Sequence, residues 1–338
     1  MTDRQGQRID TTRLQEMSRA YTATAVLWAA LDLGLFTAVD AGARDEASLA
    51  EELGISELNA ERLVVSCLSL GLLDTAEGGL QNAPDVDRYL VEGRPGYAGA
   101  WMRFTRRDVP GWFAIAETMT SGVEPTHLGM YENLTVEAAR KYHQATYSIG
   151  MGAGRRFVRQ VDLEGRRRLL DLGGGSGAYS INVVEAYPEM SAVVLDLPPV
   201  VEVTAEFLAR HGVEDRVETL GGDFTSTPFP TDCDVVVMAS NLPIYDSPTI
   251  AAVVARAHDA LLPGGEMHLI GEMLHDDRKG PVDAAMWGMN ELLCGGRGRA
   301  HTEAECVGYF TDAGFTDLAV VDFIPGVLRR VTGVKPLA

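Results

Sequence analysis

The chain has 338 residues, which is enough for about two domains. Hydrophobic residues make up 46% and charged residues 23%, a globular composition that excludes a wholly disordered or fibrous protein. Lys and Arg number 29 against 48 Asp and Glu, so the net charge is −19. Such a negative surface repels phosphates and anionic membranes, and we expect neither nucleic acid nor membrane as a partner.

Cysteine spacing and the lack of long apolar segments exclude further classes. The four cysteines form no CxxC pair: Cys67, Cys233, Cys294 and Cys306. This spacing suits neither a zinc site nor a disulfide framework, so we expect reduced thiols, no metal and a cytoplasmic location. The N-terminal residues lack the apolar region of a signal peptide, and no window approaches about 18 apolar residues, so no membrane span is expected.

Residues 1–100 predict a helical N-terminal domain. The stretch 11–38 reads as a long helix that is too apolar for a solvated surface, so we expect it to pack against a second copy of the chain. Residues 46–73 predict a helix-turn-helix, and LLDTAEGGLQNA adds a β-hairpin, which together make a winged helix. The recognition helix carries Glu57 and Glu61, the wrong charge for a DNA groove, so dimerisation is the expected role.

Residues 101–160 predict a mostly helical connector. Connectors between domains are places where small-molecule pockets form. Four residues near its end recur at helical spacing, and they are expected either to line a substrate pocket or to fill the core: Tyr142, His143, Tyr147 and Met151.

Residues 161–338 change to short runs rich in Val, Leu and Ile that alternate with helical stretches. Buried parallel strands have this composition, and their alternation with helices predicts an α/β domain with an open, doubly wound, Rossmann-like sheet. The final runs, TDLAVVDFI and PGVLRRVTGVK, predict two strands joined at Ile324-Pro325-Gly326. A hairpin reverses the chain, so the last strand is expected to be antiparallel.

The glycine-rich segment Asp171-Leu-Gly-Gly-Gly-Ser-Gly177 follows the first strand of this sheet and opens a helix. Glycines permit a sharp turn that brings backbone N–H groups close to a ligand, although this segment alone also fits a dinucleotide fingerprint. Asp196 is placed for ribose hydroxyls, and Asp223 and Phe224 for an adenine ring. The complete set of expected cofactor contacts is Asp171, Gly173, Gly175, Gly177, Asp196, Leu197, Gly222, Asp223, Phe224, Ser240 and Asn241.

These motifs, together with Leu262-Pro-Gly-Gly-Glu266, resemble the class I methyltransferases that depend on S-adenosylmethionine (SAM). Residues 12–336 resemble the plant-type O-methyltransferase family and its bacterial small-molecule relatives through ALDLGLFTAV, SLAEELGI and ERLVVSCLSLGLL. The resemblance implies a winged-helix dimerisation domain over 1–100, a connector over 101–160 that lines the substrate pocket, and a SAM-binding catalytic domain over 161–338. It also implies a mostly parallel seven-stranded sheet and a homodimer.

The catalytic pattern departs from that family. The resemblance implies a histidine base in a pattern like S-N-x-x-H-D, but this chain reads Ser240-Asn241-Leu-Pro-Ile244-Tyr245-Asp246, with isoleucine at the base position. Glu272 matches one of two carboxylates that orient the histidine, and Ala300 replaces the other. Three explanations follow: a non-catalytic regulator, a base relocated to another histidine, or a nucleophile with no proton to lose. The relocated base could be His127, His143 or His301.

The missing base bears directly on the identity of the methyl acceptor. The missing base favours S-methylation of a thioether acid such as 4-methylthio-2-hydroxybutyrate, and the pattern is similar to the methylthiohydroxybutyrate S-methyltransferases of dimethylsulfoniopropionate synthesis. O-methylation of a phenol or polyketide is the alternative, and C-methylation of a 2-oxo acid is a third. A guanidinium such as that of Arg299 could hold a substrate carboxylate. The expected substrate contacts are Tyr142, His143, Tyr147, Met151, Tyr245, Trp287, Asn290, Arg299 and His301.

Overall fold

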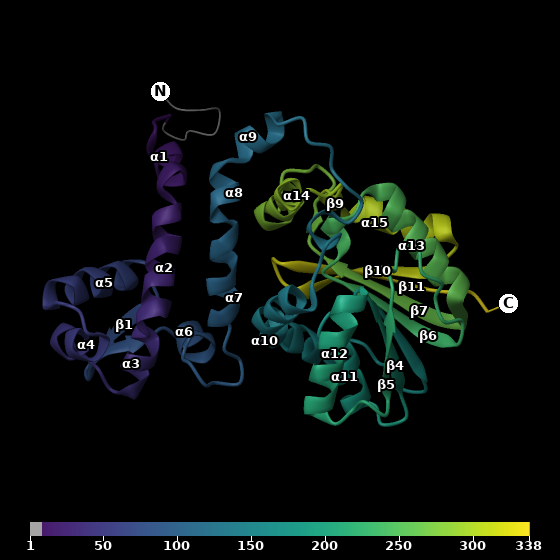
Figure 1. The fold of residues 1–338 in the computed structure, drawn as a ribbon, viewed down its shortest axis with the longest axis horizontal. Helices are drawn as coiled ribbons and strands as arrows, with labels where there is room; N and C mark the ends of the chain where they lie inside the picture. Colours follow the sequence, from purple (N-terminus) through teal and green to yellow (C-terminus); the bar gives the residue numbers. More distant parts are fainter. Residues whose placement is uncertain (1–8, 338) are drawn as a thin grey trace. The chain divides into compact units, whose positions relative to one another are not determined.

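The computed structural model describes residues 9–337, and the chain forms two compact units that divide between Arg106 and Arg107 (Figure 1). Residues 1–8 hold part of the segment in which no signal peptide was expected, and they lie outside the described residues. The expected connector 101–160 is split by this division. Its first six residues belong to the first unit, and the remainder belongs to the second.

The first unit is mostly helical. Its elements are α1 (Thr12–Arg19), α2 (Tyr21–Leu33), α3 (Leu35–Ala41), α4 (Glu46–Leu53), α5 (Glu57–Ser69), β1 (Leu73–Ala76), β2 (Gly79–Asn82), α6 (Pro84–Tyr89) and α7 (Gly99–Phe104). The expected single helix over 11–38 is divided at Ala20 and Gly34. Gly34 has a left-handed φ of 75°, and its N–H closes α2 on the carbonyls of Ala30 and Leu31.

The winged-helix pattern is present. The side chain of Ser56 accepts a hydrogen bond from the N–H of Asn59 at 3.3 Å, which starts α5 as expected. β1 and β2 pair antiparallel across the Glu77-Gly78 turn. The core of the unit gathers side chains from α2 to α6 around the fully buried Phe36 and Leu49.

Two arginines at the end of this unit are paired with carboxylates inside it. Arg103 lies 3.4 Å from a carboxylate oxygen of Asp32 and 3.1 Å from one of Glu92. Arg106 lies 2.8 Å from the other oxygen of Asp32, and its guanidinium stacks 5.1 Å from the Trp28 ring.

The second unit alternates helices and strands. Its elements are α8 (Val109–Phe113), α9 (Ile115–Thr120), η2 (Gly129–Tyr131), α10 (Val136–Gln160), β3 (Arg168–Leu172), α11 (Ala178–Ala186), β4 (Ser191–Asp196), α12 (Pro198–His211), β5 (Val217–Gly221), β6 (Cys233–Ala239), η3 (Leu242–Ile244), α13 (Ser247–Ala260), β7 (Leu261–Gly271), β8 (Met273–Leu274), α14 (Val282–Cys294), β9 (His301–Thr302), α15 (Glu303–Ala313), β10 (Thr316–Ile324) and β11 (Leu328–Val334). The short η1 (Thr105–Asp108) spans the division between the units.

A seven-stranded sheet in the order β10-β11-β7-β6-β3-β4-β5 forms the centre of the second unit. Strands β3 to β7 are parallel, while β11 runs antiparallel to both β7 and β10. The α/β fold expected from the sequence, with an antiparallel last strand, is therefore confirmed.

Helices cover both faces of this sheet (Figure 1). Alternate strand residues point to opposite faces, so Leu169 packs with α10, α11 and α12 while Leu170 packs with α13 and α15. The long helix α10 crosses close to α11, because a Cβ on Gly154 would lie 2.6 Å from the carbonyl oxygen of Ala178. This close packing holds α10 beside the loop that follows β3.

Residues 9–337 also bear on membrane insertion and metal binding. No single helix there is long and apolar enough to cross a membrane, although the bent pair Thr12–Leu33 and Leu35–Ala41, at 53°, reaches that length and composition together. No group of three or more His, Cys, Asp or Glu side chains in the same range could hold a metal ion.

The exposed face of α1 and α2 predicts self-association. Leu14, Met17 and Tyr21 share one helical face and are 55%, 65% and 56% exposed, and α1 has no buried residue. We expect a dimer in light scattering at micromolar concentration, and a monomer for the double variant Leu14→Asp/Met17→Asp. Val327→Asp, which changes an exposed residue of the last hairpin, is the control and should stay dimeric. A monomeric parent chain would contradict this prediction.

Candidate active site

Four parallel strands end at one edge of the sheet, and polar residues follow each of them. β3 and β6 are neighbours, but β4 and β5 continue the sheet on one side while β7 continues it on the other. Ligands of open α/β sheets bind outside the carboxyl ends of the strands at such a switch point. The expected cofactor residues all lie at this edge, in the last residues of β3 and β4 or in the loops that follow β3, β4, β5 and β6.

The loop Gly173–Gly177 joins β3 to α11 through three glycines with positive φ. The angles are 63° at Gly173, 56° at Gly175 and 74° at Gly177. A Cβ on Gly175 would lie 2.7 Å from Cε1 of His143, and a Cβ on Gly173 would lie 2.5 Å from Nδ2 of Asn241. A larger residue would therefore be strained and would also collide, so the loop offers bare backbone at the switch point.

Asp171 lies beneath this loop and is 1% exposed. Oδ2 accepts a hydrogen bond from the hydroxyl of Ser180 at 2.8 Å, whereas Oδ1 is buried and has no partner among residues 9–337. Burial raises the pKa of Asp171 to about 6, although the Ser180 hydrogen bond opposes the shift. A buried acceptor without a donor is costly in a native protein, so this oxygen is suited to a donor supplied by a ligand.

Asp196 ends β4 and supports the same loop. Its two oxygens accept hydrogen bonds from the N–H of Gly175 at 2.8 Å and the N–H of Leu197 at 2.7 Å. Burial raises the pKa of Asp196 to about 6 against these two bonds. Each oxygen keeps a second lone pair, so the carboxylate can accept from a pair of hydroxyls.

Asp223 and Phe224 follow β5, where Gly222 gives the chain room to turn. Oδ1 of Asp223 accepts from the N–H and the hydroxyl of Thr225, and Oδ2 lies 3.5 Å from Nε2 of His127. Phe224 is buried, with its ring centroid 5.3 Å from that of Tyr245. His127, one of the expected replacement bases, is thus engaged with Thr225 and Asp223 at this end of the site.

Ser240 and Asn241 differ in what they contact. Nδ2 of Asn241 donates to the carbonyls of Leu172, Gly173 and Ala239 at 3.0–3.2 Å, and so joins the ends of β3 and β6. Ser240 is exposed, with a positive φ of 59°. In this structure Asn241 positions the glycine loop through the loop's own backbone.

The four predicted residues of α10 separate into two pairs. Tyr142 and His143 lie at the site, since His143 touches the glycine loop and its ring packs edge-on to Tyr142 at 5.1 Å. Tyr147 stacks on Phe207 of α12 at 4.5 Å and hydrogen-bonds His211, and Met151 is buried in the core. The structure therefore brings only the first pair to the glycine loop.

Burial lowers the pKa of His143 to about 4. The imidazole is neutral near pH 7, and so weak a base is a poor match for the proton of a phenol. His143 therefore meets the loop as an uncharged ring.

The segment after α14 passes directly over the position where the family histidine is absent. A Cβ on Gly298 would lie 2.1 Å from the carbonyl oxygen of Pro243 and 2.6 Å from that of Ile244. Ala300 is equally close to α14, because a Cβ on Gly288 would lie 2.4 Å from its backbone nitrogen. The backbone of residues 298–300 therefore packs directly on η3 and on α14, with no side chain between them.

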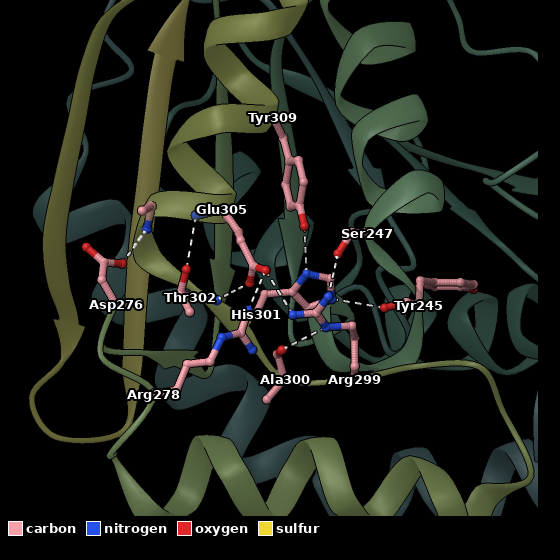
Figure 2. Close-up of polar contacts among 11 residues, drawn as sticks. Tyr245, Ser247, Asp276, Arg278, Arg299, Ala300, His301, Thr302, Glu305 and Tyr309 are labelled. Atoms are coloured by element: carbon pink, nitrogen blue, oxygen red, sulfur yellow. Dashed lines mark hydrogen bonds and ion pairs between the residues drawn. The ribbon is translucent and has the colours of Figure 1, made fainter.

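Figure 2 shows what holds Arg299 and His301 after this crossing. Nδ1 of His301 lies 2.9 Å from the hydroxyl of Tyr309, and Nε2 lies 2.9 Å from the carbonyl oxygen of Tyr245. Arg299 pairs with Glu305 at 2.8 Å and bonds the hydroxyl of Ser247 at 3.2 Å. Both side chains therefore serve contacts within the protein, which leaves His301 no ring nitrogen for a substrate proton.

Two further buried carboxylates come from the end of β7 and from α14. Burial raises the pKa of Glu272, between β7 and β8, to about 7, and the charge of Asp283 adds to the shift. Burial likewise raises the pKa of Glu291, on α14, to about 7. The sequence did not predict Glu291 as a site residue, because it belongs to no motif, whereas its neighbours Trp287 and Asn290 were predicted substrate contacts. Asn290 donates to Cys294 at 3.3 Å, and Trp287 is half-buried.

Residues 15–92 match the O-methyltransferase dimerisation domain, and residues 120–316 match the O-methyltransferase domain. The chain is 35% identical to 3-hydroxy-5-methyl-1-naphthoate 3-O-methyltransferase from Streptomyces sahachiroi, over 96% of this chain and 95% of that protein. It is 30% identical to the tetracenomycin polyketide synthesis 8-O-methyl transferase of Streptomyces glaucescens, over 95% and 96%.

Solved structures share the fold. Human N-acetylserotonin methyltransferase in complex with SAM superposes with a TM-score of 0.80 at 23% identity, covering 99% of this chain and all of that one. PigF with S-adenosylhomocysteine superposes with a TM-score of 0.77 at 21% identity, covering 97% of this chain and 100% of that one.

Asp196→Ala is expected to weaken SAM binding by about 1–3 kcal/mol, because a ribose would lose its acceptors. Isothermal titration calorimetry with SAM measures the change. Asp259→Ala is the control, since that carboxylate is 86% exposed at the end of α13. Equal SAM affinity in the Asp196 variant and the parent would contradict the assignment of Asp196.

His143→Phe is expected to make the protein less sensitive to acid. An unfolded histidine titrates near 6.5 and the folded one near 4, so the neutral ring contributes stability above about pH 6.5 that is lost as the pH falls toward 4. The parent should lose up to about 3 kcal/mol more than the variant over that window. Urea unfolding at pH 7.5 and pH 4.5 tests this, and equal losses would refute it.

Proposed function

The chain belongs to the O-methyltransferase family, and on that basis we propose that this SAM-dependent methyltransferase acts on a phenolic hydroxyl of an aromatic, polyketide-type small molecule. One observation carries the choice of acceptor. Tyr142 and Tyr245 lie at the site with two protonatable carboxylates, Glu272 and Glu291. Flat aromatic rings are suited to bind another aromatic ring, and carboxylates are suited to accept a hydroxyl proton.

The cofactor edge fits SAM. The unpaired oxygen of Asp171 suits the donor groups of its methionine part, and the bare backbone of Gly173–Gly177 admits that part closely. Asp196 suits the ribose hydroxyls, while Asp223 and Phe224 suit the adenine. When bound, SAM supplies a methyl group on a positively charged sulfur, and the buried carboxylates of this edge complement that charge.

The domain arrangement expected from the sequence completes the proposal. Residues 1–100 would form the dimer, 101–160 would contribute Tyr142 and His143 to the acceptor side, and 161–338 would bind SAM. The dimerisation-domain match and the exposed apolar face of α1 support a homodimer.

S-methylation of a thioether acid is the competing hypothesis. Ile244 and Ala300 favour it, because such a reaction needs neither a base nor its orienting acid. Three features weigh against it: the short thioether acid offers no ring to the tyrosines, Arg299 is already paired with Glu305, and the two Streptomyces relatives are O-methyltransferases by name.

A substrate panel separates the two hypotheses. The full-length enzyme is incubated with SAM and, separately, 2-naphthol, a hydroxynaphthoic acid, catechol or 4-methylthio-2-hydroxybutyrate, and S-adenosylhomocysteine formation is measured. We expect turnover with the fused-ring phenols and a methyl ether as product by mass spectrometry. Gly175→Val, in which the side chain would collide with His143, is the inactive control. Turnover confined to the thioether acid would reject the phenol proposal.

A further inference from the structure

Glu291 is a buried carboxylate on α14. It is 4% exposed, and its side chain makes no hydrogen bond or ion pair with any residue in the range 9–337. It also lies in the last turn of α14, where the helix dipole disfavours negative charge. Both features cost folding free energy and neither is offset by a structural contact, so a role in binding or chemistry is indicated.

The position of Glu291 links it to the place where the family base is absent. The point that a Cβ on Gly296 would occupy lies 3.4 Å from Oε2 of Glu291 and 3.9 Å from the carbonyl oxygen of Ile244. Glu291 and the backbone of Ile244 therefore both lie close to Gly296.

Titratable groups from three other elements face the Glu291 carboxylate. Its charge acts on Tyr131 of η2, Tyr142 of α10 and Tyr245 after η3, in each case adding to the effect of burial in raising the tyrosine pKa. Cys294 lies one turn further along α14 and also senses this charge. The charges of Arg107 and Glu272 also act on Tyr142: Arg107 lowers its pKa and Glu272 raises it.

Tyr245 connects this carboxylate to the cofactor edge. Its ring lies 5.3 Å from that of Phe224, and the charges of Asp223, Asp196 and Glu291 all reach its hydroxyl. Tyr245 therefore links Glu291 to the cofactor edge. Among the candidate histidines, His143 has a pKa lowered to about 4, and both ring nitrogens of His301 are bonded inside the protein.

We propose that Glu291 is the general base of this enzyme and replaces the absent histidine. The inference rests on the proposed O-methylation. The proton of the acceptor hydroxyl passes to a carboxylate oxygen of Glu291 while the hydroxyl oxygen forms a bond to the methyl carbon of SAM. The bond between that carbon and the sulfonium sulfur breaks, and its electron pair stays on sulfur. A methyl ether and S-adenosylhomocysteine leave, and Glu291 releases the proton to water.

The raised pKa of Glu291 suits this role. A carboxylate with a pKa of about 7 is largely ionised at pH 8 and is a stronger base than an exposed glutamate. Glu272 shares the raised pKa, to which the charge of Asp283 contributes, and it follows Gly271, which packs on Leu242 of η3. Glu272→Gln is therefore the comparison variant.

Acceptors of different acidity test the proposal. Single-turnover rates with saturating SAM are measured at pH 8 for 2-naphthol, which keeps its proton, and 1-nitro-2-naphthol, which is already ionised. Glu291→Gln should slow 2-naphthol methylation by at least about 100-fold and barely affect the nitro compound, since an ionised oxygen needs no base. Glu291→Asp should recover part of the rate. Glu189→Gln, an exposed glutamate, should match the parent with both acceptors.

The outcomes distinguish the two proposals. Equal slowing of both acceptors by Glu291→Gln, or selective loss in Glu272→Gln instead, overturns the role of Glu291 while O-methylation stands. A parent enzyme that methylates neither naphthol, and only the thioether acid, overturns both proposals.

A binding and stability measurement adds a readout that does not depend on turnover. Glu291→Gln should bind S-adenosylhomocysteine like the parent, because the cofactor edge is untouched. The melting temperature of Glu291→Gln should exceed that of the parent by a margin that grows from pH 5 to pH 8. Burial raises the pKa of Glu291 in the folded parent above its value in the unfolded chain, so the folded parent loses stability as the pH rises and this carboxyl group ionises. A variant that melts lower at pH 8 would mark Glu291 as structural and overturn the proposal.

Discussion

The close approach of side chains to the backbone of the glycine loop determines the geometry of the rest of the site. His143 of α10 lies close against Gly175, and Asn241, which follows β6, lies close against Gly173. Asn241 also binds carbonyl groups of both strand ends, so β3, β6 and the loop form one hydrogen-bonded unit. Helix α10, which packs on the sheet, and strand β6, which belongs to it, are therefore both held at fixed distances from the loop Gly173–Gly177.

The site collects carboxylates that burial has removed from water. The pKa of Asp171 and Asp196 is raised to about 6, and that of Glu272 and Glu291 to about 7. Each raised value means that burying the ionised form costs stability, which is common where activity and stability conflict. A methyl donor with a positive sulfur is the natural complement to this arrangement, because a bound cation offsets the repulsion among the carboxylates.

The sequence was sufficient where local chemistry determines structure. The glycine segment, the strand-end carboxylates and the closing hairpin each carry a short pattern with one physical meaning, and all lie where they were expected. Helical spacing in α10 was not sufficient, because it cannot tell which face meets a neighbour, and Tyr147 packs on α12. Ser247, which accepts a hydrogen bond from Arg299, is also distant from it in sequence. Glu291 was missed because burial, and not any motif, makes it unusual.

The contact between Gly288 and the backbone of Ala300 has a consequence for how this sequence can change over time. Any side chain at position 288 would push the Arg299–His301 segment away, and with it the bonds from His301 to Tyr245 and Tyr309. A substitution at position 288 is therefore restrained by the residue at position 300, twelve residues later in the chain. Homologous sequences that carry a bulkier residue at position 288 should carry a compensating change near position 300, so the two columns of an alignment would vary together.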